Sequence, residues 1–549
     1  MNYKTPGVYV EEQAKFPPSV AQVETAIPAF IGYTADGPKN KPTRISSMLE
    51  YEALFGKANP ETFAVAFKDG VATATQTKVS DFKMYYAMQM YFANGGGACY
   101  IVSVGAENVY YLAVSLAELQ AGLDLLKKED EPTLIVFPDL QGLVASSADV
   151  VAAQRAKLAS DEAAEAAEQA FNVAGLAALE AADQLEAAQE AADAAPGNAA
   201  LAAALAAAKL VVAAANQAVT DTDADKDTAN AIATIANTNL TKVITANSND
   251  AAANAYNLYN LALDQSELLK DRFVIMDVLG EISAFKGDSG PSSGSSGERL
   301  KYGAAYYPKL KTVLSYDFKD ANVSVMGVSG VTNLAELKTS NSEFYNQAKK
   351  AIESKPVVLA PSSAMAGVYA KVDSTSGVWK SPANVGLSFV QEPTIKISDR
   401  DQDALNIDSN GGKSINAIRT FTGKGTLVWG ARTLDGNSNE WRYISVRRFF
   451  NMVEESVKKA TERFVFESNT ANTWIRVQTM IENFLNQQWQ DGALAGSKPE
   501  EAYYVSVGLN KTMSAQDILE GRMVIEVGMA AVRPAEFIVL RFSHKLQEA

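Results

Sequence analysis

The last third of the chain, residues 377–549, carries the strongest structural pattern in the sequence. Between residues 441 and 467, apolar side chains recur at steps of three and four, while charged side chains fill the other positions. This is the spacing of a helix that buries one face. Residues 474–490 carry a second stripe of this kind, and residues 423–432 form a strand-like run punctuated by glycines. The pattern predicts a compact α/β module, and it contains no recognisable catalytic constellation.

Both ends of the chain are predicted to be extended arms. Prolines at 6, 17 and 18 disfavour a helix near the N-terminus, and the residues around Tyr9 favour a strand. The other end is a second strand-forming segment, 536–541. A short strand at each end can be added to the sheet of a neighbouring copy through backbone hydrogen bonds. The candidate residues for strand exchange between subunits are Val8, Tyr9, Val10, Phe537, Ile538, Val539 and Leu540.

The middle of the chain predicts an α/β domain in two parts, 25–146 and 254–376. Short apolar runs bounded by glycine and proline are expected to be strands, at 27–32, 98–104, 134–137, 273–277, 304–307 and 357–359. Helical segments such as 344–354 and 362–372 separate them. This alternation favours a largely parallel sheet covered by helices. Such sheets often hold a ligand at the ends of their strands, so an α/β enzyme with an appended helical domain is an alternative function.

An alanine-rich, acidic segment interrupts this domain between residues 147 and 253. About a third of its residues are alanine, a composition typical of long helices or coiled coils. We expect at least three helices folded as antiparallel hairpins, with turns at 195–198 and at 220–227. Large apolar residues are sparse, so the core of this segment should be thin. The segment is predicted to be an acidic, independently folded projection that faces solvent.

Composition and motifs favour a structural role over chemistry. The net charge of −15 argues against a general nucleic-acid binder. The single cysteine, Cys99, excludes an intrachain disulfide and lies in an apolar run, so we expect a buried thiol. The only histidine, His544, is near the C-terminus. A histidine-based nucleophile, base or metal site is therefore excluded from the prediction.

Three short motifs resemble ligand sites but lack required residues. Residues 411–414, Gly-Gly-Lys-Ser, have Ile407 where a phosphate-binding loop needs glycine. The acidic runs 399–403 and 221–227 lack both the glycine and the bidentate glutamate of a calcium loop. We therefore predict no cofactor, no metal and no catalytic residue.

Several segments, in the right order along the chain, resemble contractile tail sheath proteins of phages and phage-tail-like injection particles. They include Tyr-Lys-Thr-Pro-Gly-Val-Tyr-Val-Glu-Glu at 3–12 and Tyr-Gly-Ala-Ala-Tyr-Tyr-Pro at 302–308. Later segments are Gly-Val-Trp-Lys-Ser-Pro-Ala-Asn at 377–384, Trp-Arg-Tyr-Ile-Ser-Val-Arg-Arg-Phe-Phe at 441–450 and Pro-Ala-Glu-Phe at 534–537. The pattern common to this family has no insertion like 147–253.

The resemblance implies a polymer rather than an enzyme. It implies stacked hexameric rings of identical subunits around an inner tube protein, with baseplate and tail-terminator proteins as further partners. It also implies a sheath that contracts and drives the tube through a target envelope, in a phage tail or a bacterial injection particle. A self-assembling lattice without contraction is the remaining alternative.

The expected fold class is a multi-domain α/β protein with an all-helical insertion. Its expected parts are an N-terminal arm, 1–24; a middle domain, 25–146 and 254–376; the helical insertion, 147–253; a C-terminal core, 377–534; and a C-terminal arm, 535–549. Lys458, Lys459 and Arg463 form a candidate basic strip for weak contact with an acidic inner tube, or else an ordinary solvated helix face. No signal peptide and no membrane insertion are predicted, so the chain is expected to be made in the bacterial cytoplasm.

Overall fold

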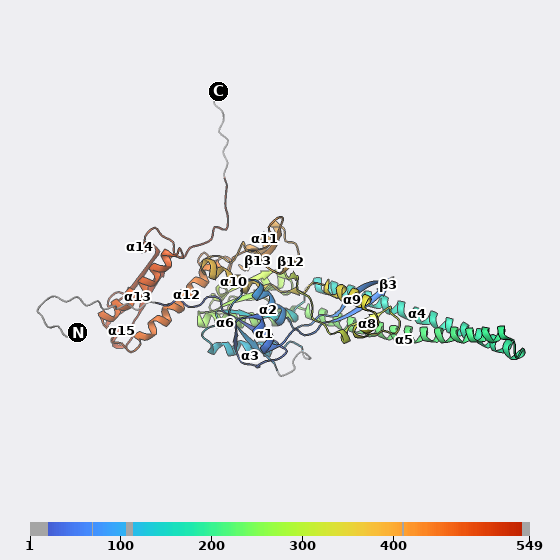
Figure 1. The fold of residues 1–549 in the computed structure, drawn as a ribbon. Helices are drawn as coiled ribbons and strands as arrows, with labels where there is room; N and C mark the ends of the chain where they lie inside the picture. Colours follow the sequence, from blue (N-terminus) through green and yellow to red (C-terminus); the bar gives the residue numbers. More distant parts are fainter. Residues whose placement is uncertain (1–19, 69, 106–112, 146, 409–410, 541–549) are drawn as a thin grey trace, which may run out of the picture.

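The computed structural model describes residues 20–540 except 69, 106–112, 146 and 409–410. Val8, Tyr9 and Val10 therefore lie outside the described residues. The molecule is elongated, with a long helical hairpin at one end and a helical module at the other (Figure 1). A sheet-based body lies between them. The predicted fold class, a multi-domain α/β protein, is confirmed.

The body is built on an eight-stranded sheet in the order β14-β13-β8-β7-β6-β1-β5-β2. Six parallel strands form its centre: β13 (Ile415–Phe421), β8 (Gly303–Tyr307), β7 (Phe273–Asp277), β6 (Leu134–Val136), β1 (Pro28–Gly32) and β5 (Cys99–Ser103). Antiparallel β14 (Gly425–Trp429) and β2 (Thr43–Ile45) close the two edges. The central strands are buried and apolar, as in a sheet covered on both faces. Five of the six predicted middle-domain strands are present in this sheet.

Two helical layers cover the sheet. Alternate residues of the strands pack against α3 (Leu116–Leu125) and α6 (Asn249–Leu269) on one face. The other residues pack against α1 (Met48–Phe55), α2 (Met84–Ala93) and α10 (Ser362–Ser376). Cys99 is fully buried in the second layer, and burial raises the pKa of its thiol. The covering of both faces explains why the strands read as continuous apolar runs.

Two features cross the expected domain limits. β13 pairs with β8, so the central sheet extends past residue 377 into the region expected to be the C-terminal core. Helix α6 begins inside the expected insertion, yet Tyr256 and Tyr259 are fully buried against the sheet. Both segments belong to the body, because they bury their apolar surface there.

Two small sheets flank the body. One joins β3 (Thr62–Lys68), β4 (Val71–Lys78) and β10 (Ser324–Met326), beside α8 (Leu334–Ser340) and α9 (Ser342–Glu353). The other is antiparallel and joins β9 (Leu310–Thr312), β11 (Val358–Leu359) and β12 (Val390–Pro393). The strand predicted at 357–359 is therefore present, but it lies outside the main sheet. Short antiparallel pairing with β9 satisfies its backbone instead.

The insertion forms a single antiparallel hairpin of two long helices, α4 (Ser147–Ala194) and α5 (Ala199–Ala246). The turn predicted at 195–198 is confirmed, with Asn198 capping α5. The prediction of a turn at 220–227, and so of three helices, is wrong because those residues lie inside α5. Thr222, Lys226 and Ala229 continue the inward face of the helix, which preserves its packing across the polar stretch.

The hairpin is a two-stranded coiled coil with an alanine-rich seam. Inward positions on both helices alternate steps of three and four residues, the heptad pattern. On the outer half they are Ala164, Ala167, Phe171, Ala174, Ala178, Ala181, Leu185 and Ala188 of α4, facing Leu201, Leu205, Ala208, Val212, Ala215 and Val219 of α5. The ends of the insertion meet at the body, where the backbone N–H of Ala145 donates to the carbonyl of Ala246 at 3.1 Å. The thin core that the sequence predicts follows from this seam.

The C-terminal module packs α12 (Ile444–Thr461) against α13 (Ala471–Gln490) and a two-stranded sheet, β15 (Tyr503–Val507) with β16 (Ile525–Met529). Both predicted helices are present. The first ends earlier than expected, in a 3-10 turn over Glu462–Phe464, and Phe466 then adopts a positive φ of 70°. That conformation lies outside the helical region, so the chain turns back there toward α13.

The crevice where α/β sheets usually hold a ligand is filled by a side chain of the protein. The chain reverses its direction across the sheet between β1 and β6, which is the usual place for a ligand. Asp139 lies there, fully buried, and accepts hydrogen bonds from the backbone N–H of Tyr33 at 2.6 Å, Lys83 at 2.5 Å and Met84 at 3.0 Å. A β-carbon on Gly32 would lie 2.4 Å from its Oδ2. The carboxylate therefore occupies the helix N-terminus that a bound anion would otherwise use.

We expect Asp139→Ala to destabilise the body by about 3 kcal/mol or more, because three buried donors lose their acceptor. In hydrogen-exchange mass spectrometry, peptides containing Tyr33 and Met84 should exchange faster. Asp124→Ala is the matched control, since Asp124 is half exposed and pairs with Lys127 on the surface. That control should change stability by less than about 0.5 kcal/mol. Unchanged exchange in the Asp139 variant would contradict this role for the carboxylate.

Candidate assembly surface

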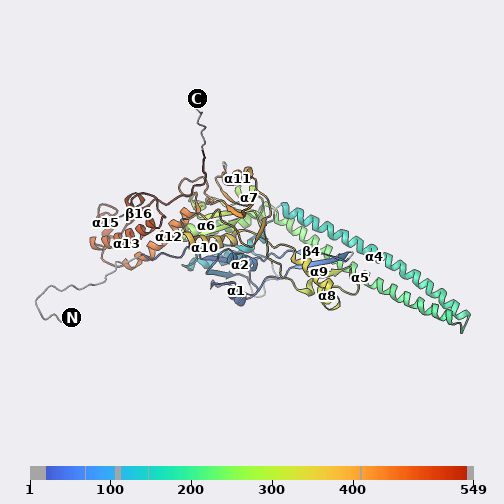
Figure 2. The same ribbon diagram turned by 45° about the horizontal axis from the view of Figure 1, so that its top comes forward.

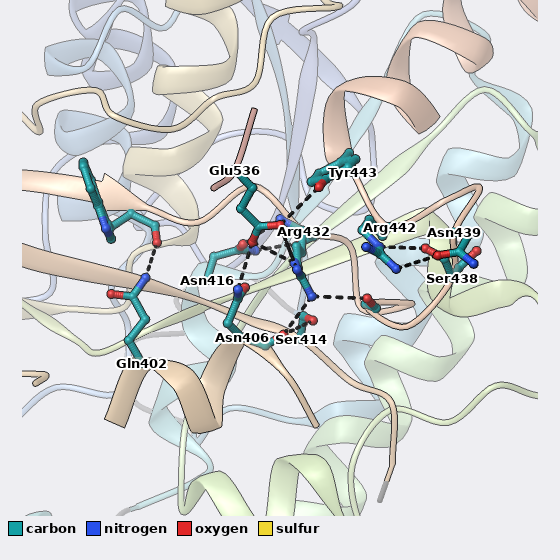
Figure 3. A network of polar contacts seen from close by, with 12 residues as sticks. Gln402, Asn406, Ser414, Asn416, Arg432, Ser438, Asn439, Arg442, Tyr443 and Glu536 are labelled. Carbon is teal, nitrogen blue, oxygen red and sulfur yellow. Dashed lines mark hydrogen bonds and ion pairs between the residues drawn. The ribbon is translucent and has the colours of Figure 1, made fainter. Parts of the chain in front are cut away.

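A bidentate ion pair anchors the start of the C-terminal arm. Arg432 follows β14 and its side chain is almost fully buried. Its Nε donates to Oε1 of Glu536 at 2.9 Å and its Nη2 donates to Oε2 at 2.7 Å (Figure 3). Tyr443 and Asn406 also donate to the carboxylate, at 3.1 and 2.8 Å. Paired, charge-assisted hydrogen bonds of this kind fix geometry as well as adding stability.

The backbone of Arg432 is itself held in place by the body. Asn416 of β13 accepts from the backbone N–H of Arg432 at 2.8 Å and donates to its carbonyl at 2.8 Å. Burial alone would raise the pKa of Glu536, but hydrogen bonds from Arg432, Asn406 and Tyr443 outweigh it and lower the pKa. The lowered pKa keeps Glu536 charged, and the clasp closed, at neutral pH. We call this ion pair and its partners the clasp.

Beyond the clasp, the chain leaves the body as an extended apolar segment. Residues 530–540 form no helix or strand, and Phe537, Ile538, Val539 and Leu540 are 69–79% exposed. Four large apolar side chains in succession on the surface of a single subunit indicate a surface that another element covers. The strand expected at 536–541 is therefore absent from the single subunit over the described residues, 536–540. Whether these residues exchange between subunits stays a prediction.

The N-terminal arm is also pinned where it meets the body. Ser456 of α12 accepts from the backbone N–H of Val23 at 3.1 Å. Arg448, on the same helix, donates to the carbonyl of Thr25 at 2.9 Å and forms a buried ion pair with Asp373. Both arms thus depart from positions that the C-terminal half of the chain fixes.

The sheet of the C-terminal module has two strands and two unfilled edges. β15 and β16 pair over five residues, from Tyr503 with Met529 to Val507 with Ile525. Val505 and Val507 are buried, and Val505 joins the core of α12 and α13. Within the described part of the chain, no further strand joins either side of this pair. A two-stranded sheet is marginal by itself, and each open edge presents backbone donors and acceptors.

The basic strip proposed for tube contact divides into two parts. Lys458 and Lys459 both pair with Glu455, at 3.0 and 3.4 Å, and both remain exposed. Arg463 lies past the end of α12, where its Nη2 contacts the Sδ of Met480 at 3.0 Å and its guanidinium lies 5.6 Å from the ring of Phe464. The two lysines form one patch, whereas Arg463 is part of the contact between α12 and α13. A role in binding a tube stays a prediction for all three.

Three ionisable groups at the carboxyl edge of the main sheet are paired with the hairpin base. A hollow of about 710 Å³ lies there, between the strand ends and the first turns of α4. Lys242 of α5 pairs with Asp81, Lys309 pairs with Asp149 of α4 at 3.1 Å, and Glu281 accepts from the backbone N–H of Ser147 at 2.8 Å. Where an enzyme of this fold would present reactive side chains, this chain seats its insertion.

Asp277, at the end of β7, is the strand-end group that most resembles a catalytic acid. Burial raises its pKa to about 7, and its Oδ1 accepts from the backbone N–H of Ser362 at 2.8 Å, at the start of α10. The described residues contain no cluster of three side chains suited to a metal ion. The fully buried carboxyl supports the helix start and reaches no open cleft.

Sequence reasoning missed the clasp and the double pinning of the arms. Arg432 and Glu536 are 104 residues apart, so no local pattern joins them. The signal available in the sequence was a single acidic residue, Glu536, beside a short apolar run near the end of the given sequence. Glu536 can fix the apolar run in place only through a partner, and only the fold identifies that partner.

Comparison with known proteins gives one family match. A family model described as the phage tail sheath C-terminal domain matches residues 437–545. The tail sheath protein of Enterobacteria phage T4 is 27% identical over 121 residues, which is 22% of this chain and 18% of that protein. The tail sheath protein of Burkholderia phage BcepMu is 27% identical over 161 residues, 28% of this chain and 32% of that protein. The chain thus aligns with less than half the length of each of these relatives.

Solved structures match over nearly the whole chain. The helical sheath of the anti-feeding prophage in its contracted state has a TM-score of 0.55 and 27% identity, covering 99% of this chain and 100% of that one. The sheath complex of the PVC extracellular contractile injection system, also contracted, has a TM-score of 0.52 and 26% identity, covering 100% and 99%. The likeness extends over the body, the hairpin and the C-terminal module.

We expect Glu536→Gln to release the start of the C-terminal arm without unfolding the body. A fluorophore attached at Ile538→Cys reports this, because Cys99 is buried and does not compete for the label. Anisotropy should fall in the Glu536 variant and stay unchanged in Glu526→Gln, which removes an exposed partner of Tyr504.

The clasp should also respond to pH in one direction. Because the folded pKa of Glu536 is lowered, its contribution is present at neutral pH and is lost as pH falls through that pKa, below the usual glutamate value of about 4.3. Anisotropy of the wild-type arm should be constant from pH 8 to about 5. A loss of anisotropy already near pH 6 would contradict the assignment.

Proposed function

We propose that the chain belongs to the contractile tail sheath protein family and is the repeating subunit of a sheath that encloses an inner tube and contracts. The observation that carries the proposal is a two-stranded sheet with two open edges in a subunit whose residues 537–540 are apolar, extended and exposed. The similar structures support contraction, since the sheaths of the anti-feeding prophage and of the PVC system were determined in a contracted state. Baseplate and tail-terminator proteins are further proposed partners.

We propose that neighbouring copies complete the β15–β16 sheet with their arms. Each open edge offers a row of backbone groups, and an apolar extended segment can bond to it with little demand on side-chain identity. Reach is sufficient: 19 residues of N-terminal arm beyond the described chain can span up to about 60 Å. The added strands would cover Phe537 and its apolar neighbours and would satisfy the edges of β15 and β16.

The fixed positions at which the two arms leave the body suit a polymer that changes shape. Contraction requires links that persist while the globular surfaces slide past one another. The clasp and the Arg448–Asp373 pair fix where each arm leaves its own subunit. Beyond that point, we propose, each arm pairs with the neighbouring subunit. Such tethers hold successive subunits in order during the rearrangement.

The proposed contact with the inner tube is weak and polar. Lys458 and Lys459 share Glu455 and remain exposed, so they can bind a carboxylate on the tube and release it. Exposed ion pairs contribute about 0–1 kcal/mol each, which permits sliding. Arg463 contributes by positioning the end of α12. In this proposal the basic strip makes the contact that slides during contraction, whereas the arms make the contacts between subunits that persist.

No catalytic role is part of this proposal. The strand ends of the main sheet are covered by the hairpin base, and Asp139 fills the crevice between β1 and β6. We propose synthesis in the bacterial cytoplasm and incorporation into a phage tail or an injection particle. The proposed division of the chain is two arms, a middle domain with its helical insertion, and a C-terminal core.

Strand addition depends on backbone N–H groups, so proline and threonine should act differently in the arm. Ile538→Pro/Leu540→Pro removes two donors and should abolish tubes seen by electron microscopy, while the subunit stays a folded monomer in sedimentation. Ile538→Thr/Leu540→Thr keeps both donors and the β preference, and should assemble. Deletion of residues 1–19 should likewise leave folded monomer. Long tubes from the proline variant or from the deletion would overturn the strand-exchange proposal.

Charge reversal tests the tube contact separately from assembly. Lys458→Glu/Lys459→Glu should weaken binding of the sheath to its co-expressed inner tube protein by about tenfold, without preventing subunit folding. Lys349→Glu is the control, because Lys349 is an exposed helical lysine on α9, beside the small sheet of β3, β4 and β10. Equal co-purification of tube protein with the double variant, the control and wild type would exclude these lysines from the contact.

A further inference from the structure

The outer half of the α4–α5 hairpin stands clear of the body. Of the described hydrogen bonds that join the hairpin to the rest of the chain, the one nearest the tip links Asp221 of α5 to Ser329. Beyond that level, both helices extend away from the body, at the end opposite the C-terminal module (Figure 2). We call residues 173–220 the outer hairpin. Its outward faces have no partner within the described subunit.

Apolar side chains lie on both outward faces of this segment. On α4, Val173, Leu176 and Leu179 are 64–66% exposed, and on α5 Leu210 is 74% exposed. Leu176 lies midway between the inward positions Ala174 and Ala178, so it points away from α5. Leu210 lies midway between Ala208 and Val212, and so points away from α4. The two leucines therefore face opposite sides of a layer that is two helices thick.

The charge of the outer hairpin is also divided between its helices. Residues 173–194 of α4 carry five acidic and no basic side chains. Residues 199–220 of α5 carry Lys209 and no acidic residue. Two α4 faces would repel each other, whereas α4 of one hairpin beside α5 of another brings acids near Lys209. This asymmetry favours contact between unlike faces.

We propose that the hairpins of neighbouring subunits pack side by side, with the α5 face of one copy against the α4 face of the next. The proposal rests on the sheath function above, which brings identical copies to a fixed spacing. A contact between different faces of identical molecules is head-to-tail, and such contacts build rings or helices rather than closed pairs. The thin alanine seam gains a third and fourth helix by this packing.

A membrane is the competing occupant, and the charges disfavour it. By length and composition alone, α5 can span a bilayer. The antiparallel partner α4 would then enter with its acidic side chains, each of which costs several kcal/mol in a bilayer core. A neighbouring hairpin covers Leu210 and leaves those carboxylates in water.

The geometry gives a specific offset. Leu176 is seven residues further from the 195–198 turn than Leu210, which corresponds to about 10 Å along the helix axis. Neighbouring hairpins displaced by about this amount bring the two leucines opposite each other. This displacement follows from the packing. It agrees with a helical tube, in which neighbouring subunits are offset along the tube axis.

Crosslinking in assembled full-length protein tests the packing. Leu176→Cys/Leu210→Cys, treated with a short bismaleimide after assembly, should give a ladder of dimers, trimers and larger products. Its two cysteines face opposite sides of the hairpin and cannot be joined within one chain, and Cys99 is buried. Each single variant alone should stay monomeric, and a mixture of the two should give dimers and no larger species.

The outcomes separate this inference from the function on which it rests. The same samples are imaged, so absence of tubes counts against the sheath proposal, whereas tubes without a ladder overturn the hairpin packing alone. Dimers from either single variant would also overturn it, since they would show like faces in contact. Flotation of the wild-type protein, but not of Leu210→Glu, with phosphatidylcholine vesicles would assign the face to a membrane instead.

Discussion

A two-stranded sheet with two open edges is the constraint on which the assembly account depends. Backbone N–H and carbonyl groups at an edge are satisfied by water in the free subunit, and any extended chain can replace that water. β15 and β16 are held flat against α13 by their inward valines, so their edges are displayed in a fixed orientation. The subunit also carries an extended apolar segment, residues 537–540. The same chain thus holds open sheet edges and a segment able to pair with them, which is why we propose that neighbouring copies complete each other's sheets.

The ion pairs of the molecule fall into two groups with different consequences. Arg432–Glu536 and Arg448–Asp373 are largely buried, with arginine side chains 3–5% exposed, and removing one partner would leave a buried charge. They fix the arm roots. The pairs of Lys458 and Lys459 with Glu455 are solvated and add little stability. A sheath needs both kinds, because it must keep its links while it changes its surfaces.

The sequence predicts what depends on local spacing and misses what depends on distant contacts. Apolar runs and helical stripes located five central strands of the main sheet and both helices of the C-terminal module, but not β13 or β2. The polar run at 220–227 was misread as a turn, because aspartate and threonine favour caps locally while the inward face of α5 continues through Thr222 and Lys226. The clasp was missed since its partners lie 104 residues apart, and β13 crossed a domain limit drawn from composition alone.

The most direct test of the central claim is an electron cryomicroscopy structure of the assembled sheath, at a resolution that traces the chain between subunits. The account predicts that strands from other copies lie along the edges of β15 and β16 of each subunit. One strand is residues 537–540 and the other is residues 8–10, from the same neighbour or from two different neighbours. Arms folded back onto their own subunit, with both edges of that sheet still open, would contradict it.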